Sequence, residues 1–254
     1  MSVPSNFCVS SLGGLFSVGR PARGRRTLRS ARPLLLTTLF LWPTLSLAVE
    51  VRVGKDASAH VVIGSDERIN DSLVVAGETV TIDGIVVGNV IAAARRITVN
   101  GTITGDLIAA AQEAELPGTV EGNAFTFSQE VELSGEVGES LHSFAEQVRL
   151  RPDANVDGDV IPFGSEVSAD GSVGRDVLAF AAMTDVRGKV GRNLEAWTAR
   201  LSLQAPAEVD GNLTAHVDDA DNVHVESGAT IGGRRDIQVR PPIVDPSKFA
   251  TPGF

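Results

Sequence analysis

The sequence predicts an all-β protein, a right-handed parallel β-helix solenoid with about 17 residues per turn. Three observations predict this fold. A seven-residue phrase recurs at a nearly fixed step, apolar residues align in columns when the repeats are superimposed, and short alternating stretches are separated by Gly and by Asn or Asp. A step this short and regular is the signature of a repeat architecture, in which each unit packs only on its neighbours.

The phrase is clearest in three consecutive copies. It reads Gly-Ile-Val-Val-Gly-Asn-Val at 84–90, Gly-Thr-Ile-Thr-Gly-Asp-Leu at 101–107 and Gly-Thr-Val-Glu-Gly-Asn-Ala at 118–124. Fainter copies begin at Gly135, Ala154, Gly171, Gly188 and Ala207. The steps between copies are therefore 17, 17, 17, 19, 17, 17 and 19 residues. A strand-helix-strand unit does not fit this step, because its crossover alone takes a dozen or more residues.

Each repeat contains three short stretches in which apolar and polar residues alternate, and this is the pattern of short β-strands. The apolar positions form three columns along the chain. The first column holds Val80, Ile97, Ala114, Val131, Val148, Val167 and Leu201, with Thr184 as the exception. The second holds Ile82, Val99, Leu116, Leu133, Leu150, Val186 and Leu203, with Ala169 as its small member. The third is unbroken and holds Val86, Ile103, Val120, Val137, Val156, Val173, Val190 and Val209.

These columns predict three strands per turn, each hydrogen-bonded to its copy in the next turn. The two longer steps place two extra residues near Arg151-Pro152 and Ala205-Pro206, where a bulged corner can absorb them. A left-handed hexapeptide helix is the alternative fold, but it needs 18-residue turns built from three similar hexads. Here the three sides differ in character, which favours the parallel β-helix and its right-handed form over the left-handed one.

Residues 1–48 are predicted to be a secretory signal peptide. This segment contains six Arg and no acid, then an apolar run from Leu34 to Leu47, and it closes on small residues that predict cleavage after Ala48. The predicted organisation is therefore a signal peptide (1–48), a β-helix domain (49–239) and a Pro-rich disordered tail (240–254). The expected location is the periplasm or cell envelope, and the alternative is an inner-membrane anchor formed by an uncleaved signal.

Loss of the leader would change the charge of the chain. It removes six of the 22 basic residues and no acid, which leaves 16 basic against 32 acidic residues and a net charge of about −16. It also removes Cys8, the single cysteine, so no disulfide, cysteine-bound metal or thiol nucleophile is expected. The acidity argues against nucleic-acid binding. We expect no cofactor and no small-molecule substrate.

One column is aromatic in five consecutive repeats. It contains Phe127, Phe144, Phe163, Phe180 and Trp197, preceded by alanines and followed by His216. The favoured interpretation is an internal stack of rings that buries a large apolar area. The alternative is an outward strip that binds glycan, a partner rod or a membrane surface. The neighbouring column mixes apolar and polar residues: Ile108, Phe125, His142, Ile161, Leu178 and Glu195.

The remaining polar residues predict corners rather than catalysis. Asp157-Gly158-Asp159 and Asp218-Asp219-Ala220-Asp221 lack the spacing of calcium loops and are interpreted as turn residues. A corner column is predicted to share hydrogen bonds along the rod, and it holds Asn89, Asp106, Asn123, Asp159, Asp176, Asn193 and Asn212. The four His, at 60, 142, 216 and 224, show no metal spacing, and Glu113, Glu130 and Glu166 share a polar column with Arg96 and Arg200. We therefore predict no catalytic, cofactor-binding or metal-binding residue.

Between Asp66 and Gly233 the chain resembles a known family. The phrase G-x-[VI]-x-G-[DN]-[VL], followed by alanine-rich and then V-x-[VIL]-x-G stretches, is similar to the bactofilins, or polymer-forming cytoskeletal proteins. The resemblance implies a right-handed β-helix that assembles end to end into non-polar filaments without nucleotide, often associated with membrane and cell-wall shape. Bactofilins are cytoplasmic, whereas Arg20 to Ala48 is typical of a secretory signal, so we expect an exported relative.

The expected function is that of a non-enzymatic structural or scaffolding protein of the bacterial cell envelope. We expect a homo-oligomer or filament that forms through the solenoid ends, at Val51 to Leu73 and Val223 to Val239, because an open end exposes unpaired strand edges. A cell-wall or envelope component is a further expected partner. The alternative is a lateral binding module for glycan or a partner protein, and a polysaccharide-acting β-helix enzyme is the least favoured reading.

Overall fold

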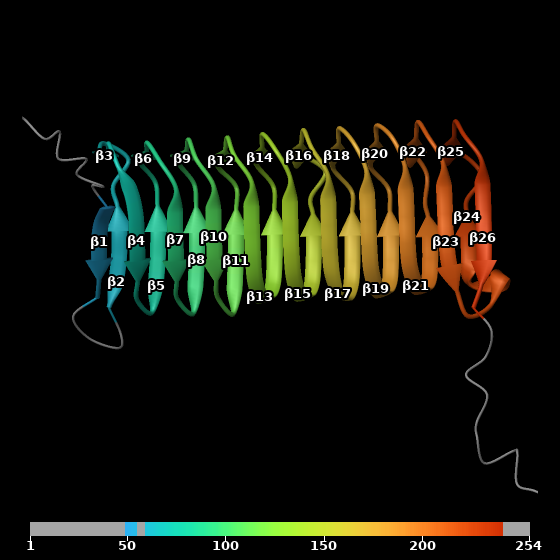
Figure 1. Cartoon of the computed structure of the whole chain (residues 1–254), viewed down its shortest axis with the longest axis horizontal. Coiled ribbons are helices and arrows are strands. Elements are labelled where there is room, and N and C mark those ends of the chain that lie inside the picture. The colour runs from blue at the N-terminus through green and yellow to red at the C-terminus, as the bar shows by residue number, and fades with distance from the viewer. Residues whose placement is uncertain (1–48, 55–58, 241–254) are drawn as a thin grey trace, which may run out of the picture. The chain divides into compact units, whose positions relative to one another are not determined.

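The computed structural model describes residues 49–54 and 59–240, which form a right-handed parallel β-solenoid (Figure 1). This confirms the predicted fold class. Each coil of the chain, here called a rung, contributes strands to three sides, and every strand pairs in parallel with its equivalents in adjacent rungs. The predicted step is also confirmed, since Leu107 lies beside Val90 in the preceding rung and beside Ala124 in the next.

The first two sides belong to one 16-stranded sheet and the third side is a separate 10-stranded sheet. The first side contains β1 (Val49–Val53), β4 (Ser72–Ala76), β7 (Val90–Ala93), β10 (Leu107–Ala110), β23 (Leu213–Val217) and β26 (Arg235–Val239). The second side contains β2 (His60–Ile63), β5 (Thr79–Ile82), β8 (Arg96–Val99), β11 (Glu113–Leu116) and β24 (Val223–Val225).

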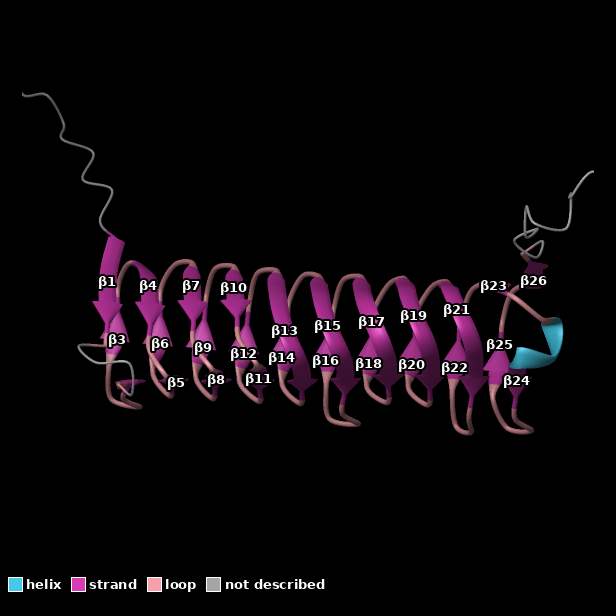
Figure 2. Cartoon of the chain, turned by 90° about the horizontal axis from the view of Figure 1, so that it is seen from below, coloured by secondary structure: helices cyan, strands magenta, loops and turns pink. Residues whose placement is uncertain are grey.

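In the middle of the solenoid the first two sides are halves of single strands ten residues long. These are β13 (Ala124–Leu133), β15 (Leu141–Leu150), β17 (Val160–Ala169), β19 (Val177–Val186) and β21 (Leu194–Leu203). Figure 2 shows them running from the first side onto the second. The third side contains only two-residue strands: β3 (Arg68–Ile69), β6 (Ile85–Val86), β9 (Thr102–Ile103), β12 (Thr119–Val120), β14 (Glu136–Val137), β16 (Asn155–Val156), β18 (Ser172–Val173), β20 (Lys189–Val190), β22 (Glu208–Val209) and β25 (Thr230–Ile231).

The core is a set of stacked side chains that runs along the inside of the solenoid. All three predicted apolar columns are buried, including the small residue Ala169 and the polar exception Thr184. Burial alternates along each strand, as in the buried-exposed-buried-exposed pattern of Leu107–Ala110. This alternation sends every second side chain inward, where it packs on the same position of the neighbouring rung. The periodicity in the sequence therefore identified the core correctly.

The corners absorb the irregular steps. Residues 152–153 and 205–206 form turns outside the strands, which confirms the two predicted insertion points. The last rung is longer still, since Leu213 pairs with Arg235 after a step of 22 residues. That step includes a short 3-10 helix, η1 (Ala220–Asn222), whose first turn is capped when Asp219 accepts a hydrogen bond from the Asp221 amide at 3.0 Å.

The predicted signal peptide (1–48) lies outside the described residues, as does the predicted tail apart from its first residue, Arg240. Over the part of the chain that the structure describes, no helix has the length and apolar character needed to cross a membrane.

Candidate functional site

The aromatic column lies on the outer face of the first side, so the expected internal stack is wrong. Phe127 and Phe144 are 47% and 43% exposed. In β13 the inward positions belong to Ala124 and Thr126, and the side chains of Phe125 and Phe127 alternate with them on the outside. The alternative in the sequence analysis, an outward strip, is the arrangement that the chain adopts.

The interior explains why the rings face outward. The inward position between the two outer columns is held mostly by small residues: Ala92, Ala109, Thr126, Ser143, Pro162, Ala179, Ala196 and Ala215. Thr126 and Ser143 are fully buried and joined by a hydrogen bond of 2.9 Å between their hydroxyl groups. Val, Ile and Leu from the other two sides fill the opposite part of the interior. A close-packed interior of this kind has no room for five more rings.

The rings form one continuous stack. Successive ring centroids from Phe127 to His216 are 5.2, 4.8, 4.5, 4.7 and 4.4 Å apart, and successive ring planes lie within 9° of each other. Phe125 and His142 stack in the same way in the neighbouring column, at 4.8 Å. The spacing between parallel strands, about 4.8 Å, sets these distances. We call the two outer columns together the aromatic strip: Phe127, Phe144, Phe163, Phe180, Trp197 and His216, beside Ile91, Ile108, Phe125, His142, Ile161 and Leu178.

The stacking limits what the aromatic strip can bind. Each internal ring has both faces covered by its neighbours, so it presents only its edge to solvent. A sugar packs against the open face of an aromatic ring, and the internal rings of the strip have no open face. The strip therefore offers a row of apolar ring edges, which fits another apolar protein surface better than a glycan.

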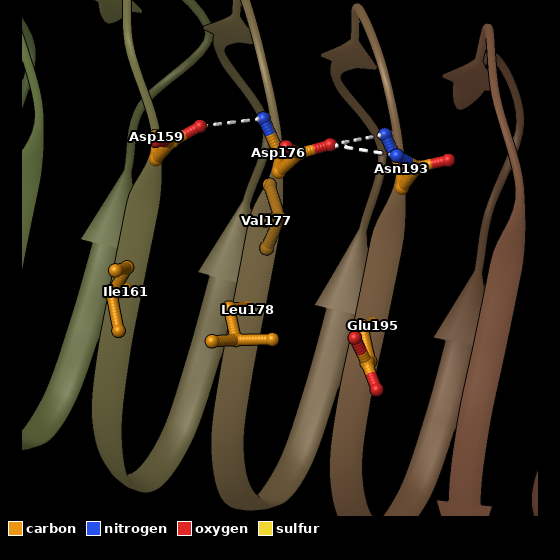
Figure 3. Close-up of a pocket in the computed structure, with 7 residues that line it drawn as sticks. All are labelled: Asp159, Ile161, Asp176, Val177, Leu178, Asn193 and Glu195. Atoms are coloured by element: carbon orange, nitrogen blue, oxygen red, sulfur yellow. Dashed lines mark hydrogen bonds between the residues drawn. The ribbon is translucent and has the colours of Figure 1, made fainter.

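Along one border of the aromatic strip runs the predicted corner column, and its hydrogen bonds are confirmed. Side-chain oxygens accept hydrogen bonds from backbone amides of the following rung: Asn89 from Asp106 at 2.8 Å, Asp106 from Asn123 at 2.8 Å, Asp159 from Asp176 at 3.1 Å, Asp176 from Asn193 at 2.9 Å and Asn193 from Asn212 at 3.0 Å. Figure 3 shows two of these bonds, which join Asp159, Asp176 and Asn193. Ser140 takes the acceptor role between Asn123 and Asp159. We call this set the corner ladder.

We expect Asn193→Ala to destabilise the solenoid by about 1 kcal/mol, because the Asn212 amide loses its acceptor. Urea unfolding of the two proteins measures the difference. Asn155→Ala is the matched control, since its side chain bonds only the carboxylate of Asp157, at 2.8 Å, and we expect a loss below about 0.5 kcal/mol. Equal losses for the two variants would contradict a structural role for the corner ladder.

A shallow groove of about 280 Å³ lies between the corner ladder and the aromatic strip. Figure 3 shows Asp159, Asp176 and Asn193 along its upper border, with Ile161, Leu178 and Glu195 side by side on adjacent strands below. Asp159 and Asp176 also form ion pairs with Arg175 at 2.6 Å and with Arg192 at 3.2 Å. Since both carboxylates already accept backbone hydrogen bonds, they serve the fold at this position rather than a reaction.

The other predicted polar residues also form structural contacts. On the second side Glu113 accepts a hydrogen bond from Arg96 at 2.7 Å, which raises the pKa of that guanidinium, and Glu130 pairs with Arg149. Within the same aligned column Met183 faces Arg200. His142 and His216 belong to the aromatic strip, and His60 and His224 lie exposed on the second side. The four His are therefore not brought together.

The first rung carries charged residues at inward positions. Glu50 and Arg52 align with the buried residues Leu73 and Val75 of the next rung on that side. Arg52 pairs with Glu50 at 2.6 Å and also with Glu67. The hydrogen bond from Arg52 holds the pKa of Glu67 below its usual range, and the same bond raises the pKa of Arg52. This cluster of two acids and one arginine covers the first end of the core.

The last rung also has a charged residue at an inward position, and its charge is positive. Arg235 aligns with the buried residue Leu213, and one of its guanidinium nitrogens lies 3.4 Å from the carbonyl oxygen of Val223. Sequence reasoning placed the two ends but missed these charged inward residues, because neither of these rungs carries the repeated phrase. Charged residues at inward positions of a terminal β-strand were the signal that could have revealed them.

Comparisons with protein-family models, with curated proteins and with solved structures find no match to this chain. In residues 49–54 and 59–240, no group of three or more His, Cys, Asp or Glu side chains is arranged to hold a metal ion. The candidate site therefore rests on the geometry of the aromatic strip, the corner ladder and the two ends.

Proposed function

We propose that the protein is a non-enzymatic structural scaffold of the bacterial cell envelope, a β-solenoid rod that associates end to end. The observation that carries this proposal is the pair of open ends. Among the described strands, β1, β2 and β3 pair only with the following rung, and β24, β25 and β26 only with the preceding one. Within residues 49–54 and 59–240 their outer edges have no neighbouring strand, and a strand edge without a neighbour can pair with an added strand.

The charges at the two ends support a head-to-tail contact. Glu50 and Arg235 occupy the same inward position on the first side, because they align with Leu73 and Leu213 of that column. If β26 of one copy pairs with β1 of the next in the same register as adjacent rungs within the solenoid, the guanidinium of Arg235 lies beside the carboxylate of Glu50. Two copies joined by their first ends would instead bring together two clusters of like net charge, each with two acids and one arginine. The proposed filament is therefore polar, unlike the non-polar filaments that the bactofilin resemblance implies.

Charge reversal tests this proposal. We expect the purified protein to form filaments one rod wide in negative-stain electron microscopy, with scattering that rises with concentration. Glu50→Lys and Arg235→Glu should each raise the concentration needed for assembly at least tenfold, and the double variant should restore it. Glu136→Lys, an exposed change in the middle of the rod, is the control and should assemble normally. Unchanged assembly of both single variants, or a monomer at every concentration, would contradict the proposal.

The envelope location rests on the basic and apolar leader at 1–48. Fractionation of cells that produce the full chain measures it. A protein shortened at about Ala48 and recovered from the periplasm agrees with the proposal. Recovery of the full-length chain from the inner membrane would favour the anchored form.

A lateral binding module is the second candidate function, and the exposure of the aromatic strip favours it. Because the internal ring faces are covered, a protein partner with an apolar surface fits the strip better than a glycan does. A polysaccharide-acting enzyme has no comparable support, since the carboxylates beside the groove are engaged in backbone hydrogen bonds and ion pairs.

A further inference from the structure

We propose that the aromatic strip binds the aromatic strip of a second copy, so that two rods lie face to face and antiparallel. This contact uses the side of the solenoid and is independent of the end-to-end association proposed above. It rests on three observations about the strip: its apolar area, the charges along its two borders and the near-symmetry of the column from Phe127 to Trp197 about the middle rung.

The exposed apolar area is large for an unpartnered surface. An aromatic side chain has roughly 150–250 Å² of surface, and Phe127, Phe144, Ile91 and Ile108 are 47%, 43%, 47% and 40% exposed. With the remaining members of the strip, this amounts to on the order of 600 Å² of contiguous apolar surface. That lies at the upper limit for a typical monomer. With polar borders added, it approaches the roughly 800 Å² per partner of a stable interface.

The borders of the strip change charge along the rod. Beside the first aromatic rungs they are acidic, with Glu121 and Glu139 on the border next to the corner ladder and Glu130 on the opposite border. Beside the last aromatic rungs they carry arginines, with Arg175 and Arg192 next to the corner ladder, each paired with a corner-ladder carboxylate of its own chain, and Arg200 opposite. All of these except the half-buried Glu130 are exposed. The strip therefore has an acidic half and a half in which arginines offset the neighbouring carboxylates.

An antiparallel pair brings these halves together. Consider a two-fold axis that crosses the rod at the rung of Phe163, so that each residue of that rung faces its own equivalent. The rungs of Phe144 and Phe180 then oppose each other, as do those of Phe127 and Trp197. On the borders the same operation places Glu139 opposite Arg175, Glu121 near Arg192, and Glu130 opposite Arg200. Asp159 and Glu166 belong to the rung on the axis, where each faces its own equivalent, and Asp159 is already paired with Arg175 of its own chain.

A parallel pair of rods would bring like charges on the borders together. Each rung would then face its own equivalent and the two borders would exchange, so Glu121 and Glu139 would oppose Glu130 and Glu146, and Arg192 would oppose Arg200. Like charges directly across an interface are unfavourable, so the charge pattern selects the antiparallel arrangement. The same acidic border disfavours an anionic lipid surface as the occupant.

Chemical cross-linking of the purified protein tests the antiparallel arrangement. All cysteine variants also contain Cys8→Ser, which removes the native cysteine, and Glu50→Lys, which weakens the end contacts. With a short bis-maleimide whose reach matches the roughly 10 Å between packed sheets, Phe163→Cys should cross-link into a covalent dimer. Phe127→Cys alone should not, because its equivalent lies four rungs away, or about 19 Å along the rod. Combining Phe127→Cys with Trp197→Cys should restore the dimer, since these two rungs oppose each other only between copies.

Sedimentation analysis gives an independent measurement of the same contact. We expect the Phe144→Ser/Phe180→Ser variant to raise the dimer dissociation constant at least tenfold. Ile85→Ser, which removes an exposed apolar side chain from the third side, should leave it unchanged. Thermal unfolding of each variant confirms that the fold is intact. A monomer at all concentrations would overturn the pairing, as would cross-linking of the single Phe127→Cys variant. Filament formation through the ends would be unaffected by either result.

Discussion

Replacing Gly188 with alanine is expected to destabilise the solenoid by about 3 kcal/mol or more. A Cβ atom at Gly188 would lie 1.8 Å from the carbonyl oxygen of Gly171 in the preceding rung. That carbonyl accepts the amide of Lys189 at 3.1 Å, so hydrogen bonding holds it in place. Because the clash is with backbone and not with a side chain, no change of rotamer relieves it, and the two rungs must separate.

The same column of the fold provides the control for this substitution. Ala207 is the equivalent residue in the next rung, and its Cβ is accommodated because the two extra residues at 205–206 widen that corner. Ala207→Gly should therefore cost only about 1 kcal/mol or less, from the greater freedom of the unfolded glycine. Urea and thermal unfolding compare the two variants with the parent protein. A Gly188→Ala protein with an unchanged unfolding midpoint would show that the corner is looser than the close approach implies.

This glycine column shows why the sequence carried so much information about the fold. In a solenoid each residue stacks on its equivalent in the next rung, so one geometric requirement is repeated many times along the chain. The unbroken valine-rich column, for example, places Val137, Val156 and Val173 on top of one another inside the third side. The longer steps could also be located in the sequence, because Arg151-Pro152 interrupts a repeat pattern that continues on both sides of it.

The charged inward residues at the ends of the solenoid could not be predicted in this way. A terminal rung has a neighbour on one side only, so its inward positions are not constrained by stacking and the repeat fades there. Glu50 and Arg235 occupy positions that hold Leu or Val in the middle rungs, and only the strand register reveals this. The terminal steps are also irregular: η1 lengthens the last one to 22 residues, and the first one, from Glu50 to Leu73, takes 23.

The outward facing of the aromatic column could have been predicted from the alternation along the strand. The general preference of large apolar side chains for burial led to the opposite prediction. Burial alternates along a strand, so Phe144, three positions after the inward residue Leu141, must face outward. The tendency of large apolar residues to be buried favours the opposite conclusion. Which effect wins depends on the volume available inside, and in this rung the inward position between them is Ser143, fully buried and already bonded to Thr126. Interior volume is a property of all three sides together and is not readable from one column.

Separate substitutions of Leu141 and Phe144 distinguish the inward from the outward position by their effect on stability. Leu141→Ala should cost about 3 kcal/mol, because Leu141 is fully buried and its removal leaves a cavity between two rungs. Phe144→Ala should cost only about 1 kcal/mol. Its ring stacks on Phe127 and Phe163, at 5.2 and 4.8 Å, but it is 43% exposed, so water and not a void replaces it. Both values are measured by urea unfolding at protein concentrations where association does not contribute.

The ratio of the two losses in the free energy of unfolding decides whether the ring is buried. The comparison is matched because both residues belong to β15, so both substitutions affect the same rungs. A Phe144→Ala loss as large as that of Leu141→Ala would mean that the ring is buried in solution. If it is buried only at high concentration, so that the cost of Phe144→Ala rises with protein concentration while that of Leu141→Ala does not, a second copy covers the ring. The exposed column would then be the interface of the antiparallel pair, and its aromatic side chains would stabilise the assembly more than the single rod.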